Sequence, residues 1–370
     1  MDLQNLSALN TLLKIDGLGP SKILNLISKF HSPFEIFSAS KNELVQVNLI
    51  SEVLAKRIQL AADRLEDNKK NTIEELDQIT EKGFKLVTYF DPEYPKILRN
   101  IYLPPIILYQ WGELIDQDKY ALAVVGTRRP TTYGKRIAEK ISTELSENHI
   151  TIVSGLARGI DSIAHRSALK NGGRTIAIIG SGLDNIYPFE NTDLAKEISK
   201  NGAVISEFPL GAKPDKQNFP RRNRIISGMS LGSIIIETNL NGGAMQTAAH
   251  ALDQNREVFA IPGNLESPQS EGTNRLIQRG EAKLVKNAED ILVELDLKLK
   301  PIIGKNIPKP NIDLNMFEQK ILDTLSNEPI QIDILASTLE YSTSDCLVNL
   351  LSLEFKGLVK QLPGKQFVRM

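Results

Sequence analysis

A dense group of side chains that can bind phosphate and nucleobases lies in residues 219–224. Arginine binds phosphate oxygens in a bidentate manner, and an aromatic ring offers a platform on which a base can stack. Lys213 and Lys216 precede the group in a proline-containing segment, and we interpret the whole stretch as a flexible basic loop. These residue types favour a ligand that carries phosphate groups. The members of the group are Phe219, Arg221, Arg222, Asn223 and Arg224.

Part of this group could have a structural role instead. Arg221 or Arg224 could form an ion pair with Asp161 or Glu237 inside the fold, because a buried charge needs a partner. The sequence leaves this alternative open for each arginine. For the group as a whole, the density of guanidinium groups favours ligand binding.

Four glycine-bearing turns follow expected strands in the central part of the chain. Glycine lets a ligand approach the backbone closely, and the loop amides together with the next helix N-terminus form an anion site. Because parallel strands end at one edge of a sheet, we expect these turns to meet in a pocket for a nucleotide or phosphate. The turn at residues 180–188 resembles a dinucleotide fingerprint only weakly, because Asn185 replaces its third glycine. The pocket residues expected from these turns are Gly126, Thr127, Arg128, Ser154, Gly155, Asn241 and Gly242.

Side chains that could support catalysis are few. Ser154 and Ser181 lack a neighbouring histidine with an acid to orient it, so nucleophilic catalysis is not indicated. No Walker motif is present, so we expect no ATP hydrolysis. The four histidines lie far apart and Cys346 is the only cysteine, which argues against a disulfide or a metal site. We therefore expect a binding protein without metal or cofactor rather than an enzyme.

The pocket residues lie where short apolar runs alternate with amphipathic stretches of helix length. Buried strands separated by helices are typical of a parallel, doubly wound α/β sheet. We therefore predict an extended Rossmann-like, mostly parallel sheet in residues 80–297. The expected strands are residues 84–90, 120–125, 150–153, 175–179, 203–205, 233–237 and 257–261, and the expected helices include 134–148, 162–171 and 244–254.

The two flanking segments are expected to form small domains. Residues 1–75 contain a turn with Gly17, Gly19 and Pro20 between apolar stretches, which indicates a helix-hairpin-helix (SAM-like) domain. Residues 298–311 are rich in lysine and proline and are expected to be a linker. Residues 312–370 predict three helices and a β-hairpin, a winged-helix domain. Its expected recognition helix, residues 344–354, carries two acids and no base, so we expect a protein contact there rather than a nucleic-acid contact.

Positive charge is concentrated in the middle of the chain. The 44 basic and 45 acidic side chains nearly balance, which by itself does not indicate a polyanionic ligand. Residues 119–230, however, carry 17 basic and 10 acidic side chains, and they include most of the expected pocket. No apolar run reaches the ~18 residues of a membrane-spanning helix, and the first residues lack a secretory signal. We therefore expect a cytoplasmic protein with no membrane partner.

Several motifs of the central region resemble, in order, those of the DprA/Smf family of DNA-processing proteins. They are VGTRRPTTYG, SGLARGIDSIAH, IGSGLDNIYP, SEFPLG, FPRRNRIISGMS, NGGAMQTAAHALDQNREVFAIPG and GTNRLIQRG. The resemblance is strong over roughly residues 85–290, and the two flanking domains fit longer members of the family. It implies a bacterial cytoplasmic homodimer that binds single-stranded DNA, protects incoming DNA during natural transformation and loads the RecA recombinase onto it.

The resemblance also implies roles for individual residues. It places Gly126, Thr127, Arg128, Lys213, Phe219 and residues 221–224 in the DNA-binding pocket. It further implies a surface for self-association and recombinase contact in the last part of the sheet domain. The candidates for that surface are Leu252, Asn274, Leu276, Ile277, Gln278, Arg279 and Leu284.

An enzyme of a related fold is the alternative. Phosphoribohydrolases that cleave nucleoside monophosphates also bind a sugar phosphate on a Rossmann-like sheet, and they carry a Pro-Gly-Gly-x-Gly-Thr-x-x-Glu string. The nearest string here, residues 241–247, has no acid, and Gln246 stands where a base would be needed. This departure favours the binding protein over the hydrolase.

Overall fold

The computed structural model describes residues 1–295, 314–326, 329–356, 358–362 and 366–369. The linker expected at residues 298–311 lies outside these ranges. The chain divides into two compact units, Met1–Lys305 and Asn306–Met370. Across the described ranges, no helix is both long enough and apolar enough to cross a membrane.

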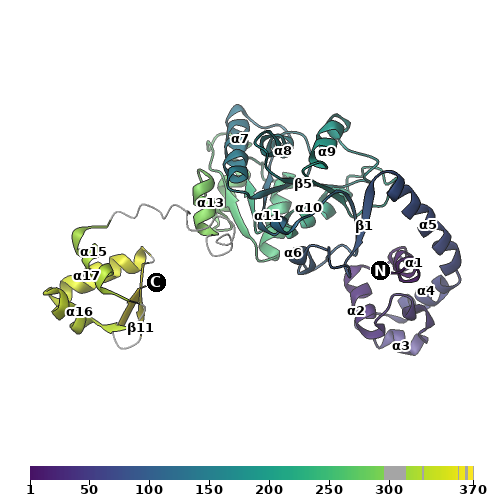
Figure 1. The fold of residues 1–370 in the computed structure, drawn as a ribbon, viewed down its shortest axis with the longest axis horizontal. Helices are drawn as coiled ribbons and strands as arrows, with labels where there is room; N and C mark the ends of the chain where they lie inside the picture. Colours follow the sequence, from purple (N-terminus) through teal and green to yellow (C-terminus); the bar gives the residue numbers. More distant parts are fainter. Residues whose placement is uncertain (296–313, 327–328, 357, 363–365, 370) are drawn as a thin grey trace. The chain divides into compact units, whose positions relative to one another are not determined.

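A nine-stranded sheet forms the centre of the first unit, in the order β1-β2-β6-β5-β4-β3-β7-β8-β9. Figure 1 shows its strands β1 and β5. The seven strands from β3 to β9 are parallel to their neighbours among these seven. Strand β2 is antiparallel to β6, and β1 is antiparallel to β2. This arrangement confirms the predicted mostly parallel sheet, although β2 and β9 were not expected from the sequence. The strands are β1 (Phe84–Thr88), β2 (Ile107–Gly112), β3 (Ala121–Val125), β4 (Thr151–Ser154), β5 (Thr175–Ile179), β6 (Gly202–Ser206), β7 (Gly232–Ile235), β8 (Glu257–Ala260) and β9 (Lys283–Leu284).

The strand order reverses at β3. From β3 the chain proceeds outward through β4, β5 and β6, and it then returns to β7 on the other side of β3. In doubly wound sheets the loops at such a switch point diverge and leave a crevice beyond the carboxyl ends of the strands. The loops after β3 and β7 therefore border the place where a ligand is expected.

Helices cover both faces of the sheet. In Figure 1, α7 (Thr132–Glu147) and α8 (Ile160–Lys170) lie on one face, and α10 (Asn218–Gly228) and α11 (Gly243–Asp253) lie on the other. Separate apolar clusters fill the two interfaces. The remaining helices of this part are α6 (Lys96–Arg99), α9 (Thr192–Ile198), α12 (Glu271–Gln278) and α13 (Ala288–Glu294), with short 3₁₀ turns η2 (Asp116–Tyr120) and η3 (Phe189–Asn191).

The arginine-rich segment is a helix, so its interpretation as a loop was wrong. Residues Asn218–Gly228 form α10, with Pro220 in the first turn, where a proline removes no helical hydrogen bond. Ile225 and Ile226 are buried against the sheet and fix this helix in place. Because successive residues of a helix are about 100° apart, neighbouring arginines point in different directions.

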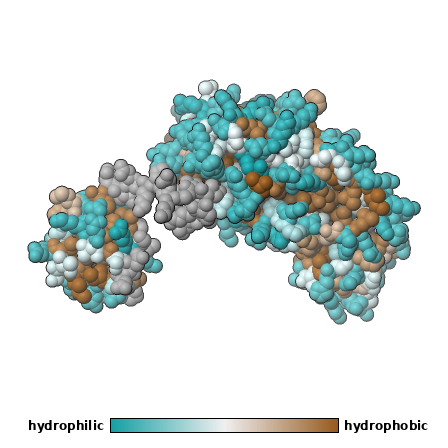
Figure 2. Space-filling model, in the orientation of Figure 1, coloured by the Kyte–Doolittle hydropathy of each residue, from teal (hydrophilic) through white to brown (hydrophobic). Residues whose placement is uncertain are grey.

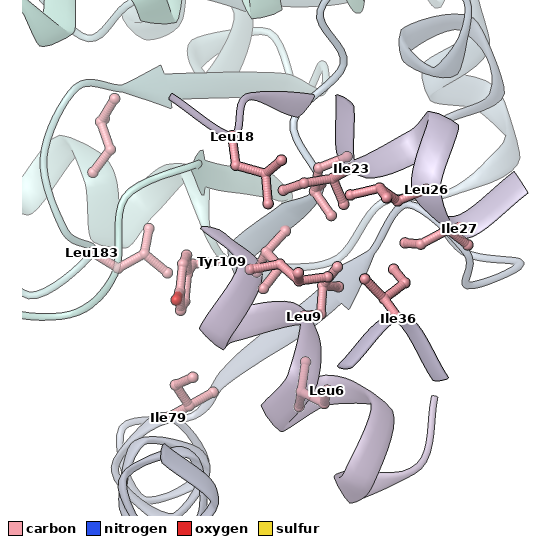
Figure 3. Packing of buried hydrophobic residues seen from close by; sticks show 14 of the residues in the cluster. Leu6, Leu9, Leu18, Ile23, Leu26, Ile27, Ile36, Ile79, Tyr109 and Leu183 are labelled. Carbon is pink, nitrogen blue, oxygen red and sulfur yellow. The ribbon is translucent and has the colours of Figure 1, made fainter. Parts of the chain in front are cut away.

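The N-terminal helices form the predicted helix-hairpin-helix region, but they share a core with the sheet. Leu9, Leu26 and Ile36 belong to the same buried cluster as Tyr109 of β2 and Leu183 (Figure 3). The hairpin glycine Gly17 has φ +84°, a conformation that glycine adopts without strain. The elements are α1 (Leu3–Leu13), α2 (Pro20–Phe30), η1 (Glu35–Ser38), α3 (Lys41–Val45), α4 (Glu52–Ala62) and α5 (Leu65–Glu81), the last of which continues beyond the domain end expected at residue 75.

The second unit has the predicted winged-helix order. Its core brings together Ile321, Leu335, Leu350 and Phe367. Hydrophobic side chains are also visible on its surface (Figure 2), and Leu347, Val348 and Leu351 of α17 are exposed. The elements are α15 (Met316–Thr324), β10 (Ile330–Gln331), α16 (Ile332–Leu339), α17 (Thr343–Phe355), β11 (Val359–Leu362) and β12 (Gln366–Arg369), with the strands in the order β10-β12-β11.

Candidate nucleic-acid interface

A pocket of about 700 Å³ opens at the switch point of the sheet. Residues after β3 and β7 line it, together with the first turns of α10 and α11. The pocket therefore lies in the crevice that the topology predicts. Of the residues expected from the sequence, Gly126, Thr127, Arg128, Phe219, Arg222, Asn223 and Gly242 line this pocket.

Arg222 is the most deeply placed cation of the pocket. Only 4% of its surface is exposed, and its Nη1 donates hydrogen bonds to the carbonyl oxygens of Gly155 and Ile178. Its Nε has no hydrogen-bond partner within the described protein. Burial lowers the pKa of Arg222 to about 10, so the guanidinium remains charged at neutral pH. A buried, fixed positive charge of this kind is well placed to bind an anion that enters the pocket.

Asp161 lies beside this cation and already has hydrogen-bond donors. Its carboxylate accepts hydrogen bonds from the amides of Gly155 at 3.2 Å and Ala157 at 3.4 Å. Burial raises the pKa of Asp161, while the charges of Arg222 and Arg128 act in the opposite direction. The carboxylate thus stabilises both the loop after β4 and the buried arginine.

Phe219 forms an aromatic wall between two arginines. The guanidinium carbon of Arg128 lies 5.5 Å from the centre of its ring, and that of Arg222 lies 5.9 Å away. Tyr187 packs on the same ring, with the two ring centres 5.8 Å apart. An aromatic ring flanked by arginines can bind a base by stacking and the adjoining phosphates by charge.

Acidic side chains accompany the N-termini of α7 and α8 but not that of α11. Glu237 is buried and accepts hydrogen bonds from the amide and the hydroxyl of Thr131, which caps α7. Asp161 occupies the first turn of α8. In contrast, α11 begins after Gly242 with no side-chain cap, and its first residues line the pocket. The partial positive charge of this N-terminus is therefore available to a phosphate.

Two arginines of the same cluster have other roles. Arg224 forms a buried ion pair with Glu207, so its internal partner is neither Asp161 nor Glu237. Arg221 is exposed; its Nε lies 4.0 Å from Glu207, and its guanidinium stacks 5.3 Å from the ring centre of Phe208. Neither residue lines the pocket.

The other expected pocket residues lie outside its lining. The hydroxyl of Ser154 donates to the carbonyl of Val124 at 2.6 Å and is fully buried. Gly155 lines a small adjoining pocket that Phe219 also lines. Lys213 and Asn241 are exposed on loops outside the pocket.

The structure adds lining residues that were not among the expected pocket residues, although the sequence analysis named Lys216 in the basic segment and Gln246 in the comparison with hydrolases. Arg129 follows Arg128 directly in the chain, and this position beside an expected site residue could have indicated that it lines the pocket. Pro268 and Gln269 come from the loop after β8, and nothing in their residue types indicates a binding role. The additional residues are Arg129, Tyr187, Lys216, Gln246, Thr247, Pro268 and Gln269.

The expected self-association residues differ in accessibility. Leu252, Gln278, Arg279 and Leu284 are exposed. Leu276 is only 2% exposed and packs in the core, where it can support this surface but not contact a partner. Two residues are partly buried: Asn274, whose amide group bonds to both backbone polar groups of Gly263, and Ile277.

The fold and the pocket define a Rossmann-like protein with a basic crevice at the switch point of its sheet. In the chain, a helix-hairpin-helix region precedes the sheet and a winged-helix domain follows it. Residues 85–296 match the family described as DNA recombination-mediator protein A, residues 308–365 match the DprA winged helix domain, and residues 9–64 match a SAM-like helix-hairpin-helix tandem. The chain therefore belongs to the DprA/Smf family of DNA-processing proteins.

Individual relatives agree with this assignment. Protein Smf of Synechocystis is 32% identical over 96% of this chain and 96% of its own length. DprA of Bacillus subtilis is 43% identical over 58% of this chain and 72% of its own length. The X-ray structure of Streptococcus pneumoniae DprA has a TM-score of 0.67 at 34% identity and covers 80% of this chain and 98% of that one. A Helicobacter pylori DprA structure, described for its single-stranded DNA binding mode, has a TM-score of 0.53 at 33% identity, over 58% of this chain and 96% of that one.

Proposed function

We propose that this protein binds single-stranded DNA in the pocket at the sheet switch point and delivers it to the RecA recombinase. The observation that carries the proposal is the joint placement of Phe219, Arg128 and Arg222 beside the uncapped N-terminus of α11. A stacking ring and several phosphate-binding groups in one crevice match the needs of an unpaired strand. The described binding mode of the Helicobacter pylori relative supports the same choice of ligand.

In this mechanism each group has a separate task. One base stacks on Phe219, and the neighbouring phosphates contact Arg128, Arg222 and the first amides of α11. These contacts read no base edge, so binding is expected to tolerate different sequences. Since phosphate contacts release counterions, affinity should fall steeply with salt.

Homodimerisation and RecA contact complete the proposal. Two pockets in a dimer would bind one strand at two points, so avidity would exceed the affinity of either pocket. Leu252 and Leu284 offer exposed apolar surface in the last part of the sheet domain, and Gln278 and Arg279 add polar groups. We assign this surface to self-association and recombinase contact. In transformable bacteria, such a protein would protect incoming DNA until RecA is loaded.

The lining of the pocket supports a binding role over hydrolysis. Among the described residues that line it, Asp161 is the single carboxylate, and it accepts hydrogen bonds from two backbone amides. Glu237 lies behind the loop after β3 and is held by Thr131. Both acids are buried and accept hydrogen bonds from neighbouring protein groups, so we infer that the protein is not an enzyme.

The decisive experiment measures the affinity for oligothymidylate by fluorescence anisotropy at fixed salt. Arg128→Ala should weaken binding at least tenfold, whereas Arg64→Ala, which removes an exposed charge on the hairpin helices, should leave it nearly unchanged. Equal affinity of the Arg128 variant and the wild type would show that this pocket does not bind the oligonucleotide. Incubation with AMP and CMP tests the alternative, because release of free base would favour a phosphoribohydrolase.

Recombinase contact has its own test. A Gln278→Ala, Arg279→Ala double variant should lose RecA in a pull-down while it retains its affinity for oligothymidylate. Full RecA retention would exclude the proposed surface.

A further inference from the structure

Phe189 is a large aromatic residue whose side chain is exposed to solvent. Its exposed fraction is 84%, and it lies in the short turn η3 between β5 and α9. A single exposed apolar residue needs no explanation by itself, because folded proteins expose many. The turn that carries Phe189, however, is fixed by several contacts and follows residues that line the pocket.

Three contacts fix this turn. The side-chain amide of Asn191 is buried and donates to the carbonyl of Leu156 at 2.8 Å and to Ser162 at 2.9 Å. Glu190 forms an ion pair with Arg158, which also donates from Nη2 at 3.0 Å. The backbone carbonyl of Phe189 itself accepts from the Thr192 hydroxyl at 2.6 Å. The backbone that carries the ring is therefore held by the three residues that follow it.

The turn continues the aromatic wall of the pocket. Tyr187 lines the main pocket and packs on Phe219. Tyr187 and Pro188 both line the small adjoining pocket, together with Arg128 and Arg158. Phe189 follows Pro188 in the chain, so an exposed ring lies two residues beyond the tyrosine that lines the pocket.

We propose that Phe189 forms a second base-stacking position for the single strand, outside the pocket and beyond Tyr187. The inference rests on the proposed function and extends it to the path of the strand. Bases stack on any exposed aromatic face with little sequence preference, and a ring on a fixed backbone loses less conformational freedom on binding. Arg158, half exposed beside this turn, supplies a cation for the phosphate between the two stacked bases.

The first test compares oligothymidylates of increasing length. Phe189→Ala should bind the shortest measurable oligonucleotide as the wild type does. It should bind longer ones at least about fivefold more weakly, the smallest loss expected from one stacked base. Tyr102→Ala is a matched control, because Tyr102 is also 84% exposed. Its neighbour Ile101 packs against Gly228, which ends α10, whereas Phe219 lies in the first turn of that helix. Equal length dependence in the Phe189 variant and the wild type would overturn the proposal.

A second test reads stacking directly. In a Trp111→Phe background, which removes the single native tryptophan, Phe189→Trp places a fluorophore at the proposed position. Oligothymidylate should quench this fluorescence, and an oligonucleotide of equal length with abasic residues outside the pocket-bound segment should not. Quenching by both, or by neither, would contradict base stacking at residue 189. If Arg128→Ala also binds oligothymidylate like the wild type, the proposed DNA-binding pocket is contradicted. If Arg128→Ala binds weakly and only the Phe189 variants behave like the wild type, only the proposed stacking position at Phe189 is contradicted.

Discussion

The guanidinium group of Arg222 lies directly against Gly155. A Cβ atom at residue 155 would come within 2.6 Å of Nη2 and 2.7 Å of Nη1 of Arg222. The same arginine donates a hydrogen bond to the carbonyl oxygen of Gly155. The missing side chain at residue 155 is therefore what allows the buried cation to reach its place in the pocket lining.

Gly155→Ala should displace Arg222 and thereby weaken DNA binding. We expect at least a tenfold loss of affinity for oligothymidylate, with a decrease of about 1–3 kcal/mol in the free energy of unfolding from overpacking. Anisotropy titration and urea denaturation measure the two effects. Gly19→Ala is the control, because a Cβ there meets nothing within 4 Å. Wild-type affinity in the Gly155 variant would show that the position of Arg222 does not matter for binding.

The buried pair Arg224–Glu207 should behave as a structural unit. Arg224→Met leaves Glu207 without its close partner in a buried site, and we expect a loss of about 3–5 kcal/mol in the free energy of unfolding. Adding Glu207→Leu should recover most of this loss, because no buried charge is then left unpaired. Urea denaturation of both variants checks the prediction. Additive losses in the double variant would contradict it.

Salt titration should separate phosphate contacts from stacking. Arg128→Ala and Arg129→Ala should each reduce the slope of log affinity against log salt by about 0.7, the value for one phosphate contact of a single strand. Phe219→Leu should lower the affinity without changing that slope, because stacking releases no counterion. A changed slope in the Phe219 variant would indicate that the ring acts only by holding the arginines.

The sheet was predictable because buried parallel strands leave a strong pattern. The expected strand at residues 175–179 agrees with β5 at both ends. By contrast, β2 was not expected, although Ile107, Leu108 and Tyr109 are buried in it. No amphipathic helix of its own accompanies this antiparallel strand, so the alternation of strand and helix that revealed the others was absent.

The location of the pocket could be predicted from the sequence, but not all of its lining residues could. Loops that follow parallel strands meet at one edge, which placed Gly126, Arg128 and Gly242 correctly among the lining residues. The directions of Arg222 and Arg224 depend on the phase of α10, and the sequence was interpreted as a loop there. Gln269 reaches the pocket from a distant loop, and such a contact depends on tertiary packing that local patterns do not encode.

Acid should destabilise the fold through His165. Burial lowers the pKa of His165 to about 3, with a further contribution from the charge of Arg222. The unfolded chain binds a proton near pH 6.5 and the folded chain does not, so stability is full above pH 6.5 and falls as the pH drops toward 3. At pH 5 the loss from this group should be about 2 kcal/mol.

Replacement of the histidine checks this assignment. In His165→Gln, urea denaturation between pH 7 and pH 5 should show a smaller loss of stability than in the wild type. The difference between the two proteins isolates His165, because Asp161, whose pKa is raised by burial, remains in both. Parallel stability curves for the two proteins would assign the acid sensitivity to other groups.

The shared core of the hairpin helices and the sheet has a practical consequence. Ile79 of α5 and Leu9 of α1 belong to the same apolar cluster as Tyr109 and Val204 of the sheet. A fragment that begins at β1 would expose this side of β2 and β6 to water and would tend to aggregate. The N-terminal helices therefore cannot be trimmed away as an optional module, and a shortened version of this protein would need polar replacements on the uncovered strands before it could be purified.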